Sequence, residues 1–358
     1  MTTKQRPPVR PEGKTFSYSW LMQADLPTRD HILSPWLRQG ESALIWAAPG
    51  VGKSMLALTI AMAVAGGGKA LGWSCDHPRR VWVVDGEMPV DDLRDRLKML
   101  TPAVEDIDKQ ALGKNLKVLA RHYQDHRRPF LDLSDETHHV ALVNTLIRDK
   151  VEVVVLDNLS TLAAVEDEND AAKMRTVVNL LVRLKQANIA TVVVHHANKG
   201  GRNYRGSTML STTFEAELGL LRDEGQDLVD TSGSARFRIE WRKFRGKRDA
   251  SVRDCSVQLE EGPDGARWVV QATQGDVSEA IAAMVRTGTY GTQKEVLEAL
   301  PSHLWPDPST RPSKQWMSKQ MGLLNAKHIL RSNEANELFN VARETPYAGA
   351  EADPHDDI

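Results

Sequence analysis

The sequence predicts an α/β protein built on a mostly parallel sheet. From about residue 42 onward, short apolar runs alternate with longer amphipathic segments. The runs are aliphatic at both odd and even positions, as expected of strands that are buried on both faces. Because strands that alternate with helices pair in parallel through right-handed crossovers, this alternation predicts a parallel sheet with helical connections.

The predicted elements follow in chain order. The apolar runs place strands at 43–47, 81–84, 116–119, 151–156 and 191–194. Apolar residues that recur at helical spacing place helices between them at 53–65, 90–100 and 171–186. After residue 215 the pattern changes to strand-like segments joined by Gly- or Asp-rich turns, at 216–222, 236–244, 251–260 and 267–272. With EGPDG at 261–265 as the clearest hairpin turn, these segments predict an antiparallel extension of the sheet.

Changes in composition divide the chain into four predicted parts. Residues 1–30 form a flexible N-terminal arm, in which Pro7, Pro8 and Pro11 interrupt any helix. Residues 31–272 form the α/β core. Residues 276–345 form a small helical domain, with helices expected at 278–287, 292–300 and 313–324. Residues 346–358 form an acidic tail.

Charge and cysteine content exclude several classes of protein. Lys and Arg total 46 and Asp and Glu total 48, and the resulting charge of −2 argues against a coat that binds nucleic acid by bulk charge. Cys75 and Cys255 cannot form a disulfide framework, which suits a reducing cytosol. The chain starts without an apolar signal segment, and the longest apolar run, 55–65, is too short to span a bilayer. We therefore expect a cytoplasmic protein with no membrane partner.

A phosphate-binding loop is the strongest motif. The segment AAPGVGKS at 47–54 follows a predicted strand and begins a predicted helix, which is the context that a P-loop requires. Glycines let backbone N–H groups face phosphate oxygens, Lys53 brings a positive charge to the β- and γ-phosphates, and the Ser54 hydroxyl is a ligand for Mg²⁺. Ala47 replaces the first glycine of the strict pattern, and this small residue leaves the loop possible. The residues expected to bind ATP are Ala48, Pro49, Gly50, Val51, Gly52, Lys53, Ser54 and Met55.

Carboxylates follow two of the predicted strands. Glu87 comes just after the strand at 81–84 and is the candidate general base for the attacking water, with Asp85 as its competitor. The alternative for Glu87 is a solvated side chain that caps the next helix. Asp157 ends the apolar run at 151–156, which is the Walker B arrangement, and is the second expected Mg²⁺ ligand.

Polar and basic residues in the second half of the chain could sense or neutralise phosphate. His195 and His196 end the strand at 191–194, although a helix cap or a surface loop is the alternative. Arg205 lies in a turn-like segment after a glycine-rich loop. Lys243 and Arg245 share one parity of a predicted strand, so they point the same way and could reach a phosphate on a neighbouring subunit.

These motifs together resemble those of the RecA-like hexameric ATPases, specifically the small plasmid and phage replicative helicases of RepA type and their AAA family 25 relatives. The resemblance covers about residues 30–250 and rests on APGVGKS, GEMP, VVVLDNLSTL, VVVHHANKGG and RGST. It implies a homo-hexameric ring with ATP and Mg²⁺ at the subunit interfaces and single-stranded DNA in the channel. Glu87 matches the catalytic Glu of the related DnaB-like helicases.

The same resemblance assigns roles to the basic residues. The Gln-Leu-Asn-Arg motif of the DnaB-like helicases is similar to 196–199, which puts the sensor role on His196 rather than His195. Their terminal Lys-x-Arg motif, which acts on the ATP of the next subunit, matches Lys243 and Arg245. The arginine of RGST is also a plausible finger in RepA-like proteins, so Arg205 and Arg245 remain alternatives for this role.

Two regions are candidates for contacts with DNA. The segment NKGGRNYRGS at 198–207 places basic residues and an aromatic ring among glycines, as loops that bind single strands do, and its candidates are Lys199, Arg202 and Tyr204. A surface loop is the alternative. In the C-terminal domain, residues 309–333 hold no acidic residue, and a helix with a basic face resembles a winged-helix module. That domain would bind DNA or other replication proteins, or serve only for packing and oligomerisation.

Three functions fit this sequence. The first is an ATP-dependent hexameric helicase-type motor that acts on single-stranded DNA in plasmid, phage or mobile-element replication. The second is a RecA-like regulatory or loader ATPase, which assembles with ATP and recruits a DNA-processing partner without unwinding. The third is a recombinase-like protein that forms filaments. Stimulation of ATP hydrolysis by single-stranded DNA distinguishes the first from the second, and open filaments would identify the third.

Overall fold

The structure is a computed structural model of the chain. It describes residues 13–163, 171–198, 204, 209–222, 235–246, 252–262, 265–272, 274–301, 304, 311–326 and 329–344. Residues Met1–Asp30 form a unit of their own, separate from His31–Ile358, and each is considered by itself. In the described part of the chain, no helix is both long enough and apolar enough to cross a membrane.

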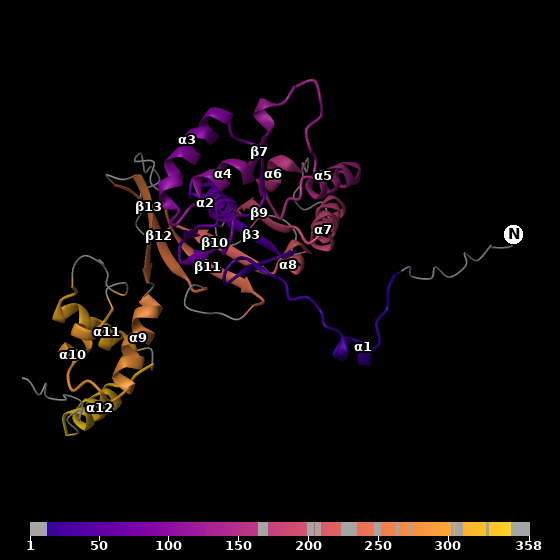
Figure 1. Cartoon of the computed structure of the whole chain (residues 1–358). Helices are drawn as coiled ribbons and strands as arrows, with labels where there is room; N and C mark the ends of the chain where they lie inside the picture. Colours follow the sequence, from indigo (N-terminus) through magenta and orange to yellow (C-terminus); the bar gives the residue numbers. More distant parts are fainter. Residues whose placement is uncertain are drawn as a thin grey trace, which may run out of the picture. The chain divides into compact units, whose positions relative to one another are not determined.

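A nine-stranded sheet forms the centre of the core (Figure 1). From one edge to the other, its strands are β13 (Gly265–Ala272), β12 (Cys255–Gly262), β11 (Arg236–Phe244), β10 (Ala216–Leu221), β3 (Ser42–Ala47), β9 (Ala190–His196), β8 (Val153–Asp157), β6 (Val81–Asp85) and β7 (Leu116–Ala120). The six strands from β10 to β7 pair in parallel, which confirms the parallel sheet predicted from the apolar runs.

The extension of the sheet differs from the prediction in one strand. β10 was expected to begin the antiparallel part, but it runs parallel to β3, with Ala216 beside Ala43 and Leu220 beside Ala47. β11, β12 and β13 then follow as antiparallel neighbours. Direction depends on the partner strand, and the partner of β10 is more than 160 residues away, so the local sequence does not determine it.

Helices cover both faces of the parallel strands. On one face lie α2 (Lys53–Gly66), α3 (Val90–Leu100), the 3₁₀ helix η1 (Thr101–Ala103) and α4 (Lys109–Asn115); on the other lie α5 (Glu136–Arg148), α6 (Leu159–Leu162), α7 (Ala171–Gln186) and α8 (Met209–Thr213). Within β3, Ile45 packs into the first layer, and Leu44 and Trp46 pack into the second. Burial of both parities explains the continuous apolar strands.

Small elements complete the core. Two short hairpins precede the second large strand, one from β1 (His31–Leu33) and β2 (Leu37–Arg38), the other from β4 (Lys69–Ala70) and β5 (Trp73–Ser74). Their tryptophans, Trp36 and Trp73, pack edge to face with each other and with Trp241 of β11, at centroid distances of 5.3 to 6.0 Å. A second 3₁₀ helix, η2 (Arg121–Tyr123), follows β7.

The N-terminal unit holds one short helix, α1 (Tyr18–Gln23), where the sequence predicted a flexible arm. Ser17 caps the helix by accepting a hydrogen bond from the backbone of Trp20 at 3.1 Å. The rings of Phe16 and Trp20 stack with their centroids 4.4 Å apart. None of the residues of α1 is buried.

The C-terminal part contains α9 (Gln274–Arg286), α10 (Gln293–Ala299), α11 (Lys314–Ala326) and α12 (Ser332–Glu344). Three of these were expected and α12 was not. The four helices share their own hydrophobic cluster, which includes Ile281, Val296, Met317 and Phe339. Among the described residues from 274 to 344 there is no strand, so the wing of the expected winged-helix module is not seen in that part.

Candidate nucleotide site

The phosphate-binding loop lies at the carboxyl end of β3 and leads into α2. Gly50 and Gly52 have φ of 74° and 118°, in the left-handed region that glycine adopts without strain. A Cβ atom on Gly52 would lie 2.9 Å from Cε1 of Phe237 and 3.0 Å from Cβ of Ala235. The loop therefore packs closely against the start of β11, and its backbone conformation fits a cradle for phosphate groups.

Lys53 begins α2 and is buried, with 7% of its surface exposed. Its Nζ donates hydrogen bonds to the carbonyl oxygens of Ala47 at 3.2 Å and Ala48 at 3.1 Å. Burial lowers the pKa of Lys53, while the carboxylates of Asp157 and Glu87 act to raise it. The ammonium group is held inside the loop by weak backbone partners, which phosphate oxygens can replace.

Asp157 ends β8 and is 5% exposed. Burial raises its pKa to about 7, and the nearby carboxylate of Asp85 adds to this rise. The Ser54 hydroxyl, which donates a hydrogen bond to Asp157, and the charge of Lys53 act in the opposite direction. A carboxylate and a hydroxyl in contact form the oxygen donor set that Mg²⁺ prefers, so these two residues fit the predicted metal site.

The structure separates the two carboxylates that the sequence left as alternatives for the general base. Oδ1 of Asp85 accepts hydrogen bonds from the backbone nitrogens of Glu87 at 2.8 Å and Met88 at 2.6 Å. Burial raises the pKa of Asp85, and these backbone donors oppose the rise. Glu87 instead is exposed, and its Oε2 accepts a hydrogen bond from Nδ2 of Asn158 at 2.5 Å. Asp85 thus stabilises the turn by accepting backbone hydrogen bonds, and Glu87 is the carboxylate available to a ligand in the cavity.

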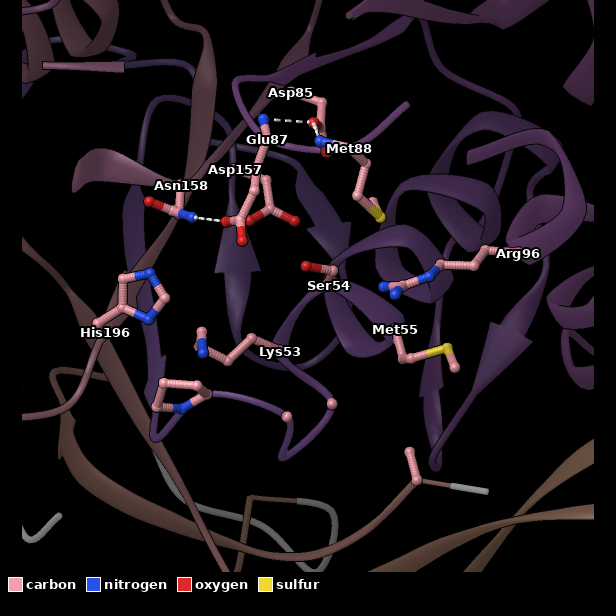
Figure 2. Close-up of a pocket in the computed structure, with 14 residues that line it drawn as sticks. Lys53, Ser54, Met55, Asp85, Glu87, Met88, Arg96, Asp157, Asn158 and His196 are labelled. Carbon is pink, nitrogen blue, oxygen red and sulfur yellow. Dashed lines mark hydrogen bonds between the residues drawn. The ribbon is translucent and has the colours of Figure 1, made fainter. Parts of the chain in front are cut away.

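These residues surround a cavity of about 290 Å³ (Figure 2). His196 and Arg96 lie on opposite sides of it, with the Glu87 and Asp157 carboxylates between them. The lining residues are Pro49, Gly50, Gly52, Lys53, Ser54, Met55, Asp85, Glu87, Met88, Arg96, Asp157, Asn158, His196 and Ala235. Of the remaining P-loop residues, Ala48 supplies a carbonyl to Lys53 and Val51 packs in the core.

Three residues at the site were not predicted from the sequence. Arg96 reaches the cavity from α3, and Asn158 follows Asp157 and orients Glu87. Arg222, just after β10, donates from Nη2 to the carbonyl oxygen of Pro49 at 3.0 Å. Asn158 could have been found as the polar residue after the Walker B strand. The two arginines carry no local signal, because their proximity depends on tertiary packing.

The two histidines at the end of β9 differ in their positions. His196 lines the cavity, while His195 is 1% exposed and lies in the core, with its ring centroid 6.4 Å from that of Tyr204. Tyr204, expected to stack on DNA, is 8% exposed and packs in the second core layer, where it bridges to Ala197. That expectation is corrected, because the ring is covered. The predicted residues Lys199, Arg202 and Arg205 lie outside the described residues.

Lys243 and Arg245 lie far from the phosphate-binding loop of the same chain. A bulge at the end of β11 turns both side chains toward α8, where Lys243 donates to the carbonyl oxygen of Ser211 and Arg245 to that of Thr212. Arg245 also pairs with Glu215 at 3.6 Å. β10 joins this end of β11 to the amino end of β3, because Ala216 pairs with both Phe244 and Ala43. About five residues of strand, roughly 16 Å, therefore separate the pair from the end of β3 that carries the P-loop.

Comparisons with known proteins identify the family. The family model AAA_25, described as an AAA domain, matches residues 6–202, which is more than half of the chain. Among solved structures, a KaiC-like protein from the hyperthermophilic archaeon Pyrococcus horikoshii OT3 is similar, at 15% identity and a TM-score of 0.46, over 66% of this chain and 93% of its own. No curated protein matches the chain in sequence.

Proposed function

The chain belongs to the AAA_25 family of AAA domains and has a RecA-like P-loop ATPase core, and on this premise we propose that it is a helicase-type motor. The proposed motor hydrolyses ATP and acts on single-stranded DNA as a homo-hexamer, in plasmid, phage or mobile-element replication. The order of its motifs, which resembles that of the RepA-type helicases, supports this choice of substrate.

In the proposed reaction, each side chain of the site has a separate task. Lys53 binds the β- and γ-phosphate oxygens and neutralises their charge. Ser54 and Asp157 would hold Mg²⁺, which would supply further charge stabilisation at the phosphates. Glu87 accepts a proton from the attacking water, and Asn158 keeps the Glu87 carboxylate oriented toward the cavity. His196 lies at the end of β9, where it can contact the γ-phosphate.

The observation that carries the oligomeric part of the proposal is the position of Lys243 and Arg245. They lie level with the amino end of β3, whereas the P-loop follows its carboxyl end, so neither can reach the nucleotide of its own chain. Together with the Lys-x-Arg motif, this supports a role on the nucleotide of a neighbouring subunit. Arg205 lies outside the described residues and remains the alternative finger.

The test is ATP hydrolysis by the purified full chain, with and without single-stranded DNA, together with strand displacement and native mass in the presence of an ATP analogue. A motor requires stimulation by DNA, ATP-dependent displacement and a closed hexamer. The Glu87→Gln variant should bind nucleotide as the wild type does and hydrolyse it about 10²- to 10⁴-fold more slowly, because it lacks a base. Equal, slow hydrolysis with and without DNA would reject the motor.

A loader or regulatory ATPase is the second candidate. It is favoured by the C-terminal helices, which share a hydrophobic cluster of their own and on which a DNA-processing partner would dock. This candidate requires assembly that depends on ATP, slow hydrolysis that DNA does not change, and no strand displacement.

A further inference from the structure

A second polar cavity, of about 650 Å³, lies beside the nucleotide site. The loop that follows β7 forms most of its wall, and Gly86 closes it on the side of the nucleotide site. Neither the nucleotide chemistry nor the predicted DNA loops use this loop. We call the cavity the basic cleft; its basic lining residues are Arg121, His122, His126, Arg127 and Arg128.

The charge of the basic cleft is one-sided. Among the ten described residues that line it, Asp125 is the one carboxylate, against three arginines. Asp125 accepts hydrogen bonds from Nε of Arg127 at 2.9 Å and Nη2 at 3.1 Å, and it lies 3.9 Å from Nε of Arg128. The side chains of Arg127 and Arg128 are 79% and 85% exposed. One carboxylate cannot neutralise three guanidinium groups, so the cleft attracts anions.

The cations are spread along the loop, and an aromatic ring accompanies them. Arg121 and Arg128 both line the cavity of about 650 Å³, which is larger than one phosphate group needs and suits a chain of phosphates. Phe130 lines the cleft, and Tyr123 of η2, which is 80% exposed, lines a neighbouring pocket that shares Gln124 with the cleft. Cations that follow a phosphate backbone, beside rings on which bases stack, are typical of sites for single strands.

A continuous set of contacts joins the basic cleft to Glu87. Nη1 of Arg121 donates to the carbonyl oxygen of Thr161 at 2.9 Å. Oγ1 of Thr161 donates to the carbonyl oxygen of Asn158 at 3.1 Å, and Nδ2 of Asn158 donates to Glu87 at 2.5 Å. Gly86 lies against the same threonine, because a Cβ on Gly86 would be 2.4 Å from Oγ1 of Thr161.

We propose that the basic cleft binds the phosphate backbone of single-stranded nucleic acid, and that Thr161 transmits its occupancy to Glu87 through Asn158. Arg127 and Arg128 contact phosphates, and Tyr123 offers its ring to a base. Thr161 is a positioning residue, since it touches neither the strand nor the nucleotide. This inference rests on the proposed function and identifies a surface by which nucleic acid would stimulate hydrolysis.

Direct binding of labelled oligothymidylate of about 30 nucleotides to the full chain tests the cleft. The variant Arg127→Gln/Arg128→Gln removes two cations, and the matched control Arg148→Gln/Arg267→Gln removes two exposed arginines elsewhere on the core. The cleft variant should bind roughly tenfold more weakly, and its slope of log K against log salt should fall by about 1.4, because each phosphate contact contributes about 0.7. The control should retain the wild-type affinity and slope. The midpoint of thermal unfolding checks that both variants fold.

The outcomes are distinguishable. A wild type that does not bind the oligonucleotide rejects the proposed function together with the cleft. A wild type that binds, with a cleft variant equal to its control in affinity and slope, rejects the cleft alone. The same measurements with oligouridylate show whether DNA or RNA is the better source of the phosphate backbone; a parallel loss of binding to both supports the cleft.

A separate variant tests the transmission. Thr161→Val keeps the volume of the side chain and removes the hydroxyl that bonds to Asn158. Its affinity for the oligonucleotide should stay within about twofold of the wild type, since Thr161 does not line the cleft. Stimulation of hydrolysis by the oligonucleotide should fall several-fold, and Thr161→Ser, which retains the hydroxyl, should restore it. Equal stimulation in the wild type and in Thr161→Val would reject the transmission.

Discussion

Replacing Asp157 by asparagine should make the metal-free protein more stable at high pH. The asparagine side chain would keep the size and hydrogen-bonding shape of the carboxyl group but could not ionise. Folding raises the pKa of Asp157 from 3.8 to about 7, because burial penalises the charged form. The stability that this proton contributes is fully present below pH 3.8, and it is lost as the pH rises through about 7.

The magnitude follows from these two values. The gap between 3.8 and about 7 corresponds to about 4 kcal/mol over the whole range. About half of it, about 2 kcal/mol, falls between pH 5.5 and pH 8, where the protein is conveniently measured.

The assay is urea unfolding of the wild type and Asp157→Asn at several pH values in the presence of EDTA. The difference in the free energy of unfolding should grow by about 2 kcal/mol in favour of the variant between pH 5.5 and pH 8. Mg²⁺ with nucleotide should then stabilise the wild type and not the variant, which should also fail to hydrolyse ATP. Two pH profiles that run parallel would refute the assignment of a raised pKa to Asp157.

The remaining predictions concern packing and the contact between subunits. Gly219→Ala should destabilise the core by about 1–3 kcal/mol, because the new Cβ would lie 2.6 Å from the indole of Trp46. Gly113→Ala in α4, where nothing lies within 4 Å of an added Cβ, should instead stabilise by up to about 1 kcal/mol; equal effects in urea unfolding would contradict this packing. Lys53→Ala and Arg245→Ala should each be inactive alone and regain hydrolysis when mixed, since mixed assemblies contain intact sites. If hydrolysis does not recover when one variant is titrated with the other, Lys53 and Arg245 do not act across a subunit interface.

The parallel core was predictable because its strands are apolar on both parities and its motifs sit at strand ends. The helix α5 was not predicted. One of its core positions is His139, which is fully buried and bonds through Nε2 to the carbonyl oxygen of Leu133 at 2.9 Å. A polar residue in a buried position interrupts the apolar spacing by which an amphipathic helix is recognised.

The candidate site was predictable in its residues and less so in their roles. Position along the chain left Asp85 and Glu87 as competing candidates for the base, and the backbone hydrogen bonds to Asp85 separate them. The composition of the loop around Tyr204 suggested exposure, whereas the backbone of Tyr204 pairs with Ala197 and its ring packs in the core. Arg96 has no signal, because α3 carries it to the cavity only after the sheet has formed.

The P-loop and Lys243 lie at opposite ends of the strands, so each subunit has two different contact surfaces: a head that carries the P-loop and a tail that carries Lys243. In the proposed motor, a contact between the head of one subunit and the tail of the next leaves one of each unused. Growth therefore continues until the chain closes, and an open assembly of n subunits holds n − 1 complete sites. The average activity per subunit should then rise steeply at the smallest assemblies and reach its full value only on closure, so dilution would lower this average before the ring has fully dissociated.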